Sequence, residues 1–221
     1  MKIVCLSFDD GTIYDVKFIE LLNKYKLKAT LNLNSGLNDF VWFYDDKPIK
    51  RLNLSEIKSL YDGHEVCSHS LNHPYFSTLN KENVIKEVEE DIHNLSLIFD
   101  RKICGFAFPF HDQTEQNILD IKENIKCLNY IRYSYLDYSG IHKDKYHIHI
   151  NALYDDPTIY DRLEEFINSS KEHNLFVIAG HSYEFEVKND WSKIEDLIKF
   201  LSQNDKIQVL TMDEAIKLIF N

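Results

Sequence analysis

Two adjacent carboxylates and two histidines four residues apart are the side chains of this sequence best suited to catalysis. Asp9 and Asp10 lie in the segment S-F-D-D-G-T. Two carboxylates this close repel each other, and a cation beside them would relieve the repulsion. His69 and His73 lie in H-S-L-N-H-P, and histidines at positions i and i+4 can face one point, a spacing that recurs in zinc sites. The competing interpretations are a solvated D-D-G turn and a pair of surface or capping histidines.

A third polar segment, I-A-G-H-S-Y-E, contains His181. All three segments follow a predicted strand, and the catalytic groups of parallel α/β folds gather at the C-terminal ends of strands. We therefore expect the three segments to meet. Two histidines and one carboxylate would supply three metal ligands and leave a position for water, which is the composition of a catalytic zinc site. The second carboxylate would remain as a base and the third histidine as an acid.

The rest of the chain alternates between short apolar runs and segments with apolar residues three or four apart, which are typical of strands and helices respectively. The predicted strands are Lys2–Phe8, Ala29–Leu33, Glu65–Ser68, Lys102–Phe108, Tyr130–Tyr133, Tyr146–Ile150, Leu175–Ala179 and Ile207–Leu210. The predicted helices are Asp15–Lys26, Ser55–Tyr61 with Ser55 as its N-cap, Lys81–Phe99, Gln113–Asn124, Tyr160–His173, Asp190–Ser202 and Met212–Phe220. Residues 35–53 are predicted to be irregular. This order predicts an α/β fold with a parallel sheet, as one domain over residues 1–221, and fits an open sheet and a closed barrel equally.

Composition restricts the partners. The 221 residues include 25 Lys+Arg and 36 Asp+Glu, a formal net charge of −11. Such a surface repels phosphate backbones and anionic lipids, so we expect no nucleic acid and no membrane as partner. The sequence shows no signal peptide and no apolar stretch near the roughly 18 residues of a membrane span. Its four cysteines form no C-x-x-C pair, which favours reduced thiols and a cytoplasmic location.

The motifs S-F-D-D-G, H-S-L-N-H-P, F-A-F-P-F and I-A-G-H-S, in this order, resemble those of the polysaccharide deacetylase family, the NodB-like carbohydrate esterases. The resemblance runs from residue 3 to about residue 215. It implies a distorted (β/α) barrel with about seven parallel strands. It also implies that Asp10, His69 and His73 bind one divalent metal ion. Zinc is the expected ion, with cobalt, nickel or iron as alternatives.

The same resemblance implies that Asp9 is the general base and His181 the general acid. Phe108 and Pro109 match the third motif, which helps to form the wall of the substrate groove. Many family members carry in that motif an arginine that orients the base, and Ala107 stands in its place.

Other departures leave two partners to be found. Arg132, in a predicted strand, is the replacement that we expect for the missing arginine, and His111 stands where a glycine often follows. No clear fourth motif supplies the usual partner of the acid histidine. Glu184 and Glu186 could orient that histidine or contact the substrate.

Several aromatic and histidine side chains are weaker candidates. Tyr183, Trp191 and Trp42 could stack on sugar rings, although most aromatic residues of a protein lie in its core. His147 and His149 alternate on one strand face, and a second metal site there is a further, less favoured hypothesis.

The sequence therefore predicts a metal-dependent hydrolase of carbon–nitrogen bonds. As a deacetylase, it would remove an N-acetyl (or O-acetyl) group from a carbohydrate or an amino sugar. One alternative is a hydrolase of a small non-sugar amide or cyclic imide. Another is a catalytically silent carbohydrate-binding protein.

Overall fold

A computed structural model of the chain describes residues 2–138, 142–170 and 175–220. The strands of its main sheet are β1 (Lys2–Asp9), β2 (Thr30–Leu33), β5 (Glu65–Ser68), β6 (Gly105–Ala107), β7 (Tyr130–Leu136), β8 (Ile148–Ile150), β9 (Ala152–Leu153), β10 (Leu175–His181) and β11 (Ile207–Leu210). All pairs between them are parallel, in the order β8-β7-β6-β5-β2-β1-β10-β9, with β11 beside β1. The path thus has eight strands, against the expected seven or so.

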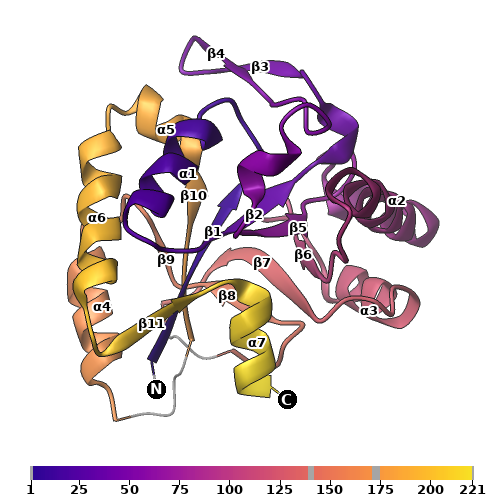
Figure 1. Ribbon diagram of the computed structural model, residues 1–221. Coiled ribbons are helices and arrows are strands. Elements are labelled where there is room, and N and C mark those ends of the chain that lie inside the picture. Colours follow the sequence, from indigo (N-terminus) through magenta and orange to yellow (C-terminus); the bar gives the residue numbers. More distant parts are fainter. Residues whose placement is uncertain (1, 139–141, 171–174, 221) are drawn as a thin grey trace.

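Helices surround this curved sheet (Figure 1), which forms a distorted barrel of parallel strands as expected. They are α1 (Asp15–Lys24), α2 (Lys81–Phe99), α3 (Glu115–Asn124), α4 (Ile159–Asn168), α5 (Ser182–Val187), α6 (Trp191–Gln203) and α7 (Met212–Phe220). None of the helices in the described ranges is both long and apolar enough to span a bilayer.

The residues at the two ends of helix α2 explain where this helix begins and ends. The Asn80 side chain accepts a hydrogen bond from the Asn83 backbone at the first turn, and Asp100 ends the helix in a left-handed conformation. Between these caps, apolar side chains at helical spacing, such as Val84 and Val88, are buried against the sheet.

Strand β1 is an interior strand of the sheet and pairs with three others. One of its edges pairs with β10 along nearly the whole strand. The other edge is shared, because β11 pairs with Lys2–Cys5 and β2 with Ser7–Asp9. As a result Asp9 lies between His181 on one neighbour and Asn32 on the other.

The prediction that residues 35–53 are irregular is wrong. The segment contains a 3-10 turn (Ser35–Leu37) and an antiparallel hairpin of β3 (Val41–Tyr44) and β4 (Lys47–Lys50). The turn of the hairpin is Asp45-Asp46, and both residues have positive φ, 47° and 59°. Two-residue hairpin turns favour positive φ at both positions, where glycine or asparagine is usual. The Asp45-Asp46 pair contains neither, so the sequence did not predict the turn.

Some helix predictions also differ from the structure. The helix predicted at Ser55–Tyr61 is a 3-10 turn over Lys58–Tyr61, and the Ser55 hydroxyl binds the Asn53 side chain instead of capping it. Helix α4 ends at Asn168, and residues 171–173 of the predicted helix lie outside the described part of the chain. Helix α5, directly after β10, was not predicted.

Candidate metal and catalytic site

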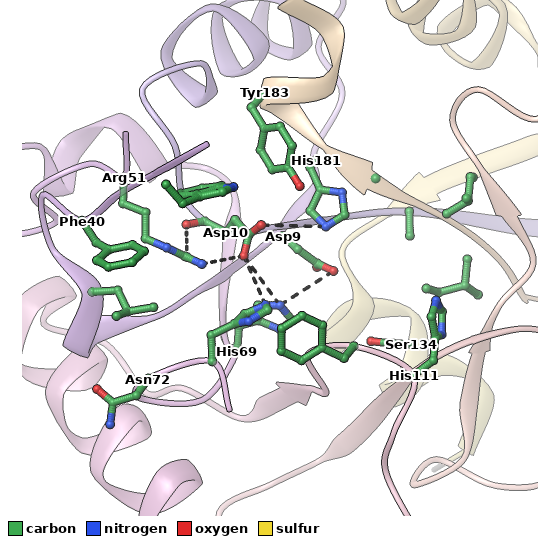
Figure 2. A pocket seen from close by; sticks show the side chains of 18 residues that line it. Asp9, Asp10, Phe40, Arg51, His69, Asn72, His111, Ser134, His181 and Tyr183 are labelled. Atoms are coloured by element: carbon green, nitrogen blue, oxygen red, sulfur yellow. Dashed lines mark hydrogen bonds and ion pairs between the residues drawn. The ribbon is translucent and has the colours of Figure 1, made fainter. Parts of the chain in front are cut away.

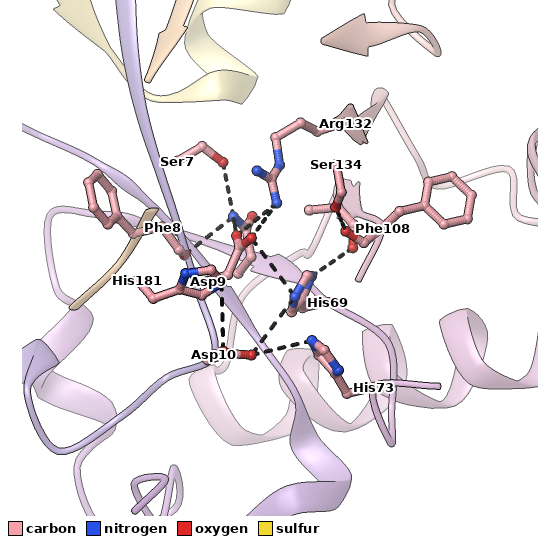
Figure 3. A network of polar contacts seen from close by, with 12 residues as sticks. Ser7, Phe8, Asp9, Asp10, His69, His73, Phe108, Arg132, Ser134 and His181 are labelled. Carbon is pink, nitrogen blue, oxygen red and sulfur yellow. Dashed lines mark hydrogen bonds and ion pairs between the residues drawn. The ribbon is translucent and has the colours of Figure 1, made fainter. Parts of the chain in front are cut away.

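Asp10, His69 and His73 come together at the C-terminal ends of β1 and β5. Their ligand atoms all lie within 4.8 Å of one another, the only such group of three His, Cys, Asp or Glu found in the described ranges. Asp10 Oδ1 is 3.5 Å from His73 Nε2 and 4.0 Å from His69 Nε2 (Figure 3). His69 donates from Nδ1 to the Ala107 carbonyl at 2.9 Å, which leaves Nε2 free to bind a cation.

The backbone at this site is unusual. Asp10 and His73 adopt left-handed conformations, with φ of 86° and 53°. Such conformations are uncommon for residues other than glycine, and they concentrate at functional sites. The ligands therefore owe their directions to a backbone that the surrounding structure must hold in place.

The protonation states suit a divalent cation. Burial lowers the pKa of His69 to about 3 and also lowers the pKa of His73, so both imidazoles are neutral at pH 7. Burial alone would raise the pKa of Asp10, but the charges of Arg51 and the nearby histidines hold it well below its ordinary value. Two neutral imidazoles and one carboxylate fit zinc, cobalt, nickel or iron.

Each of the two adjacent carboxylates has its own arginine. Arg132, fully buried on β7, places Nη2 2.8 Å from both carboxylate oxygens of Asp9. Arg51, which follows β4, places Nη2 2.8 Å from Asp10 Oδ1 and also donates to the Asp10 carbonyl. The repulsion expected between the carboxylates is therefore balanced by cations of the protein itself.

Asp9 lies beside the metal-ligand group as an ionised carboxylate. Its Oδ2 is 4.0 Å from His69 Nε2, and its Oδ1 accepts a hydrogen bond from the Asn32 side chain at 2.6 Å. Burial would raise the pKa of Asp9, but Arg132, His69 and His181 together hold it below its ordinary value. The expected contact between Arg132 and Asp9 is thus confirmed.

Arg51 and Asn34 connect the two ligand-bearing loops, and neither was predicted. The Asn34 side-chain oxygen accepts from Arg51 Nη1, while its amide nitrogen donates to the carbonyls of His69 and Ser70 at 2.6 and 2.7 Å. Asp10 is thereby linked to the loop of the histidine pair. A signal was present, since asparagines at 32 and 34 are polar positions in and just after an otherwise apolar strand.

His181 completes the group from the end of β10. Its Nε2 is 3.8 Å from Asp10 Oδ2, and its Nδ1 is 3.2 Å from Glu184 Oε2. Burial would lower the pKa of His181, but the hydrogen bond to Glu184 and the charges of Asp10 and Asp9 raise it to about 9. Glu184 itself is held by Lys188 at 2.8 Å. His181 is therefore protonated at neutral pH and faces the two carboxylates.

A cavity of about 560 Å³ opens over these residues (Figure 2). All five residues predicted to bind metal or to act as base and acid form part of its lining, together with Arg51. Its apolar lining comes from Leu37, Phe40, Trp42, Phe110, Ile150 and Leu153.

The predicted substrate-binding residues divide into two groups. Tyr183 lines this cavity, and so does Trp42. Phe108 and Pro109 do not, because both are buried beneath it, and Phe108 packs edge to face against Phe76. The next residue, Phe110, takes the position on the wall.

Glu184 and Trp191 also do not line the cavity. Glu184 pairs with His181. This contact fits the first of the two roles considered for Glu184, which is to orient the acid histidine. Trp191 donates from Nε1 to Glu186 at 2.8 Å, and the Lys17 ammonium lies 4.0 Å from its ring centre.

The suggested second metal site at His147 and His149 has no support in the described residues. His147 binds Asp144 through Nδ1 at 2.8 Å and Glu115 through Nε2 at 3.2 Å, so its two ring nitrogens point to different partners. His149 packs instead against the rings of Tyr133 and His142.

A family model, polysaccharide deacetylase, matches residues 1–140. Among solved structures, the Xyl-CE4 domain of a multidomain xylanase from the hindgut metagenome of Trinervitermes trinervoides has a TM-score of 0.66 at 18% identity, covering 98% of this chain and 90% of that one. A family 4 acetyl xylan esterase from Clostridium thermocellum, in complex with a cobalt ion, has a TM-score of 0.64 at 18% identity, covering 98% and 91%. A CE4 family pseudoenzyme from Bacillus anthracis has a TM-score of 0.63 at 16% identity, covering 97% and 65%. No curated protein matches the sequence.

Proposed function

Since the chain belongs to the polysaccharide deacetylase family, we propose that it is an active, metal-dependent deacetylase. Its substrate would be an N-acetylated (or O-acetylated) carbohydrate or amino sugar. The observation that carries this proposal is the convergence of Asp10, His69 and His73 on one point, with Asp9 and His181 beside them. Each of the last two has a charged partner that favours its ionised form, Arg132 and Glu184 respectively.

In the proposed reaction a divalent ion held by Asp10, His69 and His73 would supply Lewis-acid chemistry at the acyl carbonyl and at the attacking water. Asp9 accepts a proton from that water, since Arg132 keeps the carboxylate ionised. His181 donates a proton to the departing amine, which is a poor leaving group without one. Each proton transfer is worth roughly 10²–10⁴ in rate.

Two alternatives remain. A catalytically silent carbohydrate-binding protein is one, because the family includes a pseudoenzyme; binding alone, however, needs neither a base nor an acid. A hydrolase of a small non-sugar amide or cyclic imide is the other, and the apolar lining of the cavity favours it. The preference for zinc and the cytoplasmic location stay predictions from the sequence.

The test measures metal content and acetate release for the wild type, Asp9→Asn and His69→Ala. We expect Asp9→Asn to keep its metal and lose about 10²–10⁴-fold in turnover, and His69→Ala to lose both metal and activity. Full turnover in Asp9→Asn would reject Asp9 as the base. A metal-loaded wild type that releases no acetate from any acetylated sugar or amide would reject the deacetylase itself.

A further inference from the structure

An aromatic wall borders one side of the candidate site. In the segment that leads into and along β3, Phe40 and Trp42 line the cavity, and their rings are nearly parallel, with centroids 6.4 Å apart. Trp42 then meets Tyr183 edge to face at 5.4 Å, and Tyr183 lies 5.0 Å from the His181 ring. Alternate residues point away, so that Phe43 on the same strand is 72% exposed and does not line the cavity.

This wall is fastened to the loop that carries Asp10. The Arg51 backbone donates to the Phe40 carbonyl at 2.9 Å, and the Leu52 backbone donates to the Gly11 carbonyl at 2.9 Å. The Arg51 guanidinium, already bound to Asp10, lies 5.1 Å from the centre of the Trp42 ring. The aromatic wall therefore has a fixed position relative to the metal ligands, which lowers the entropy cost of binding against it.

A second apolar surface comes from the loop after β6. Phe110 has a left-handed backbone, with φ of 55°, and its ring is 37% exposed at the cavity. This conformation is unusual for a bulky residue and points to a functional constraint. The ring stacks on Tyr75 at 4.1 Å and meets His73 at 4.4 Å.

The two surfaces line the same cavity as the carboxylates. Figure 2 shows Phe40 on one side of Asp9 and Asp10, and His111 on the other. Ile150 and Leu153 extend the apolar lining.

Some polar side chains in the cavity lining already have hydrogen-bond partners within the protein. The Asn72 amide donates to Glu87 Oε1 at 2.8 Å, and the Ser134 hydroxyl donates to the Phe108 carbonyl. Moving a sugar hydroxyl out of water costs free energy when it finds no hydrogen-bond partner in the cavity. An apolar group suffers no such loss, and the volume of about 560 Å³ matches the cavities that bind small ligands.

We propose that this pocket accepts a small acylated compound that carries an apolar ring or chain next to the scissile bond, in preference to a carbohydrate. The inference rests on the proposed hydrolytic function. Of the two substrate classes named there, it selects the small non-sugar amide over the carbohydrate. The apolar group belongs either to the leaving amine or to the acyl part, and in both cases it would contact the cavity lining formed by Phe40, Trp42 and Phe110.

Binding can be measured without hydrolysis. The sequence has two tryptophans, and Trp191 lies outside the cavity, so Trp191→Phe leaves Trp42 as the reporter. In a zinc-loaded Asp9→Asn, Trp191→Phe protein, N-benzylacetamide and N-acetylglucosamine are titrated against Trp42 fluorescence. We expect N-benzylacetamide to bind at least about tenfold more tightly, as one buried aromatic contact predicts. Equal or tighter binding of the sugar would overturn the inference.

Hydrolysis by the wild type then identifies the position of the apolar group. In one series the amine grows from methylamine to benzylamine with acetyl kept constant; in the other the acyl group grows from acetyl to hexanoyl with methylamine kept constant. A rise in kcat/KM along either series supports the pocket and tells which side it holds. A flat or falling response in both contradicts it. If nothing is hydrolysed while benzylacetamide still binds preferentially, the proposed function fails and the inference about the pocket stands.

Two variants and a matched control test the walls directly. Phe40→Ala and Phe110→Ala should each raise KM for the preferred apolar substrate about tenfold, with a smaller effect on kcat. Phe43→Ala removes the same ring from the same hairpin but outside the cavity, and should leave KM unchanged. Identical kinetics in all three variants would overturn the inference.

Discussion

Ala107 on β6 and Arg132 on β7 are paired residues in the parallel ladder between these strands. The resemblance of the third motif predicts an arginine at the position of Ala107. Here the Arg132 guanidinium contacts Asp9 from the next strand, at the same level of the sheet. The Ala107 carbonyl instead accepts a hydrogen bond from His69 and fixes the orientation of its ring. The contact expected for the candidate base is therefore made by a residue from a different strand.

Replacing Arg132 by methionine should make Asp9 a general base only at higher pH. Arg132 holds the pKa of Asp9 down against the effect of burial, so its removal should raise that pKa and move the acid limb of kcat/KM to higher pH. Because Asp9 then remains buried without its partner, we also expect a loss of stability of about 3–5 kcal/mol. The pH–rate profile and urea unfolding check both. Arg162→Met, at a partly buried arginine that does not line the cavity, is the control, and an unshifted acid limb in Arg132→Met would contradict the assignment.

Replacing Glu184 by glutamine should reduce the protonated fraction of His181, the candidate general acid. The hydrogen bond and charge of Glu184 help to raise the pKa of His181 to about 9, so the variant should lose the proton of His181 at lower pH. The basic limb of kcat/KM should move to lower pH, with a loss of roughly tenfold to a hundredfold at pH 8. Glu186→Gln, on the same helix but paired with Trp191, should behave as wild type. Equal profiles for the two variants would mean that Glu184 does not tune His181.

Replacing Arg51 by methionine should weaken metal binding. Removal of a cation near Asp10 would by itself favour a metal ion, but Arg51 also holds both the Asp10 carboxylate and, through Asn34, the histidine loop. Losing such outer-shell contacts typically costs about 10–100-fold in metal affinity, and we expect this effect to dominate. Competition with a chromogenic chelator gives the zinc dissociation constant, with Lys50→Met on the exposed face of β4 as control. Tighter zinc binding in Arg51→Met would show that charge outweighs positioning.

Asp91 of α2 should make stability depend on pH. Burial raises its pKa from 3.8 to about 7, although Ser35 and Ser68 donate hydrogen bonds to it at 2.7 and 2.6 Å. The folded state thus holds a proton that the unfolded chain releases above pH 3.8, and this contribution to stability is lost as the pH rises toward 7. The slope is at most about 1.4 kcal/mol per pH unit. Asp91→Asn cannot ionise, so its melting temperature relative to wild type should rise between pH 5 and 7; parallel curves would contradict this.

Most strands and the meeting of the three polar segments could be predicted, and the structure confirms them. The reason is physical: buried parallel strands are apolar runs, and their C-terminal ends share one edge. Asp9, Asp10, His69, His73 and His181 all follow such runs.

Arg51 and Phe40 could not be predicted in the same way, although Trp42 and Tyr183 of the same aromatic wall were named as stacking candidates. Arg51 reaches Asp10 through a hairpin whose turn lacks the usual glycine, and its contact depends on how that hairpin folds back over residues 11–13. Phe110 was not predicted, for a related reason. The third motif predicts a wall at Phe108, but a left-handed backbone two residues later presents the next aromatic ring instead.

The pairing of β1 with three other strands also bears on how the chain reaches its folded state. Asp9 and His181 are neighbours only because β1 pairs with β10, a strand made much later during synthesis. Contacts of such large sequence separation form slowly. Until β10 docks, the apolar strand at the start of the chain has an unpaired edge, and such edges promote aggregation. The same pairing that assembles the site thus makes the nascent chain dependent on rapid completion, or on a chaperone that covers β1.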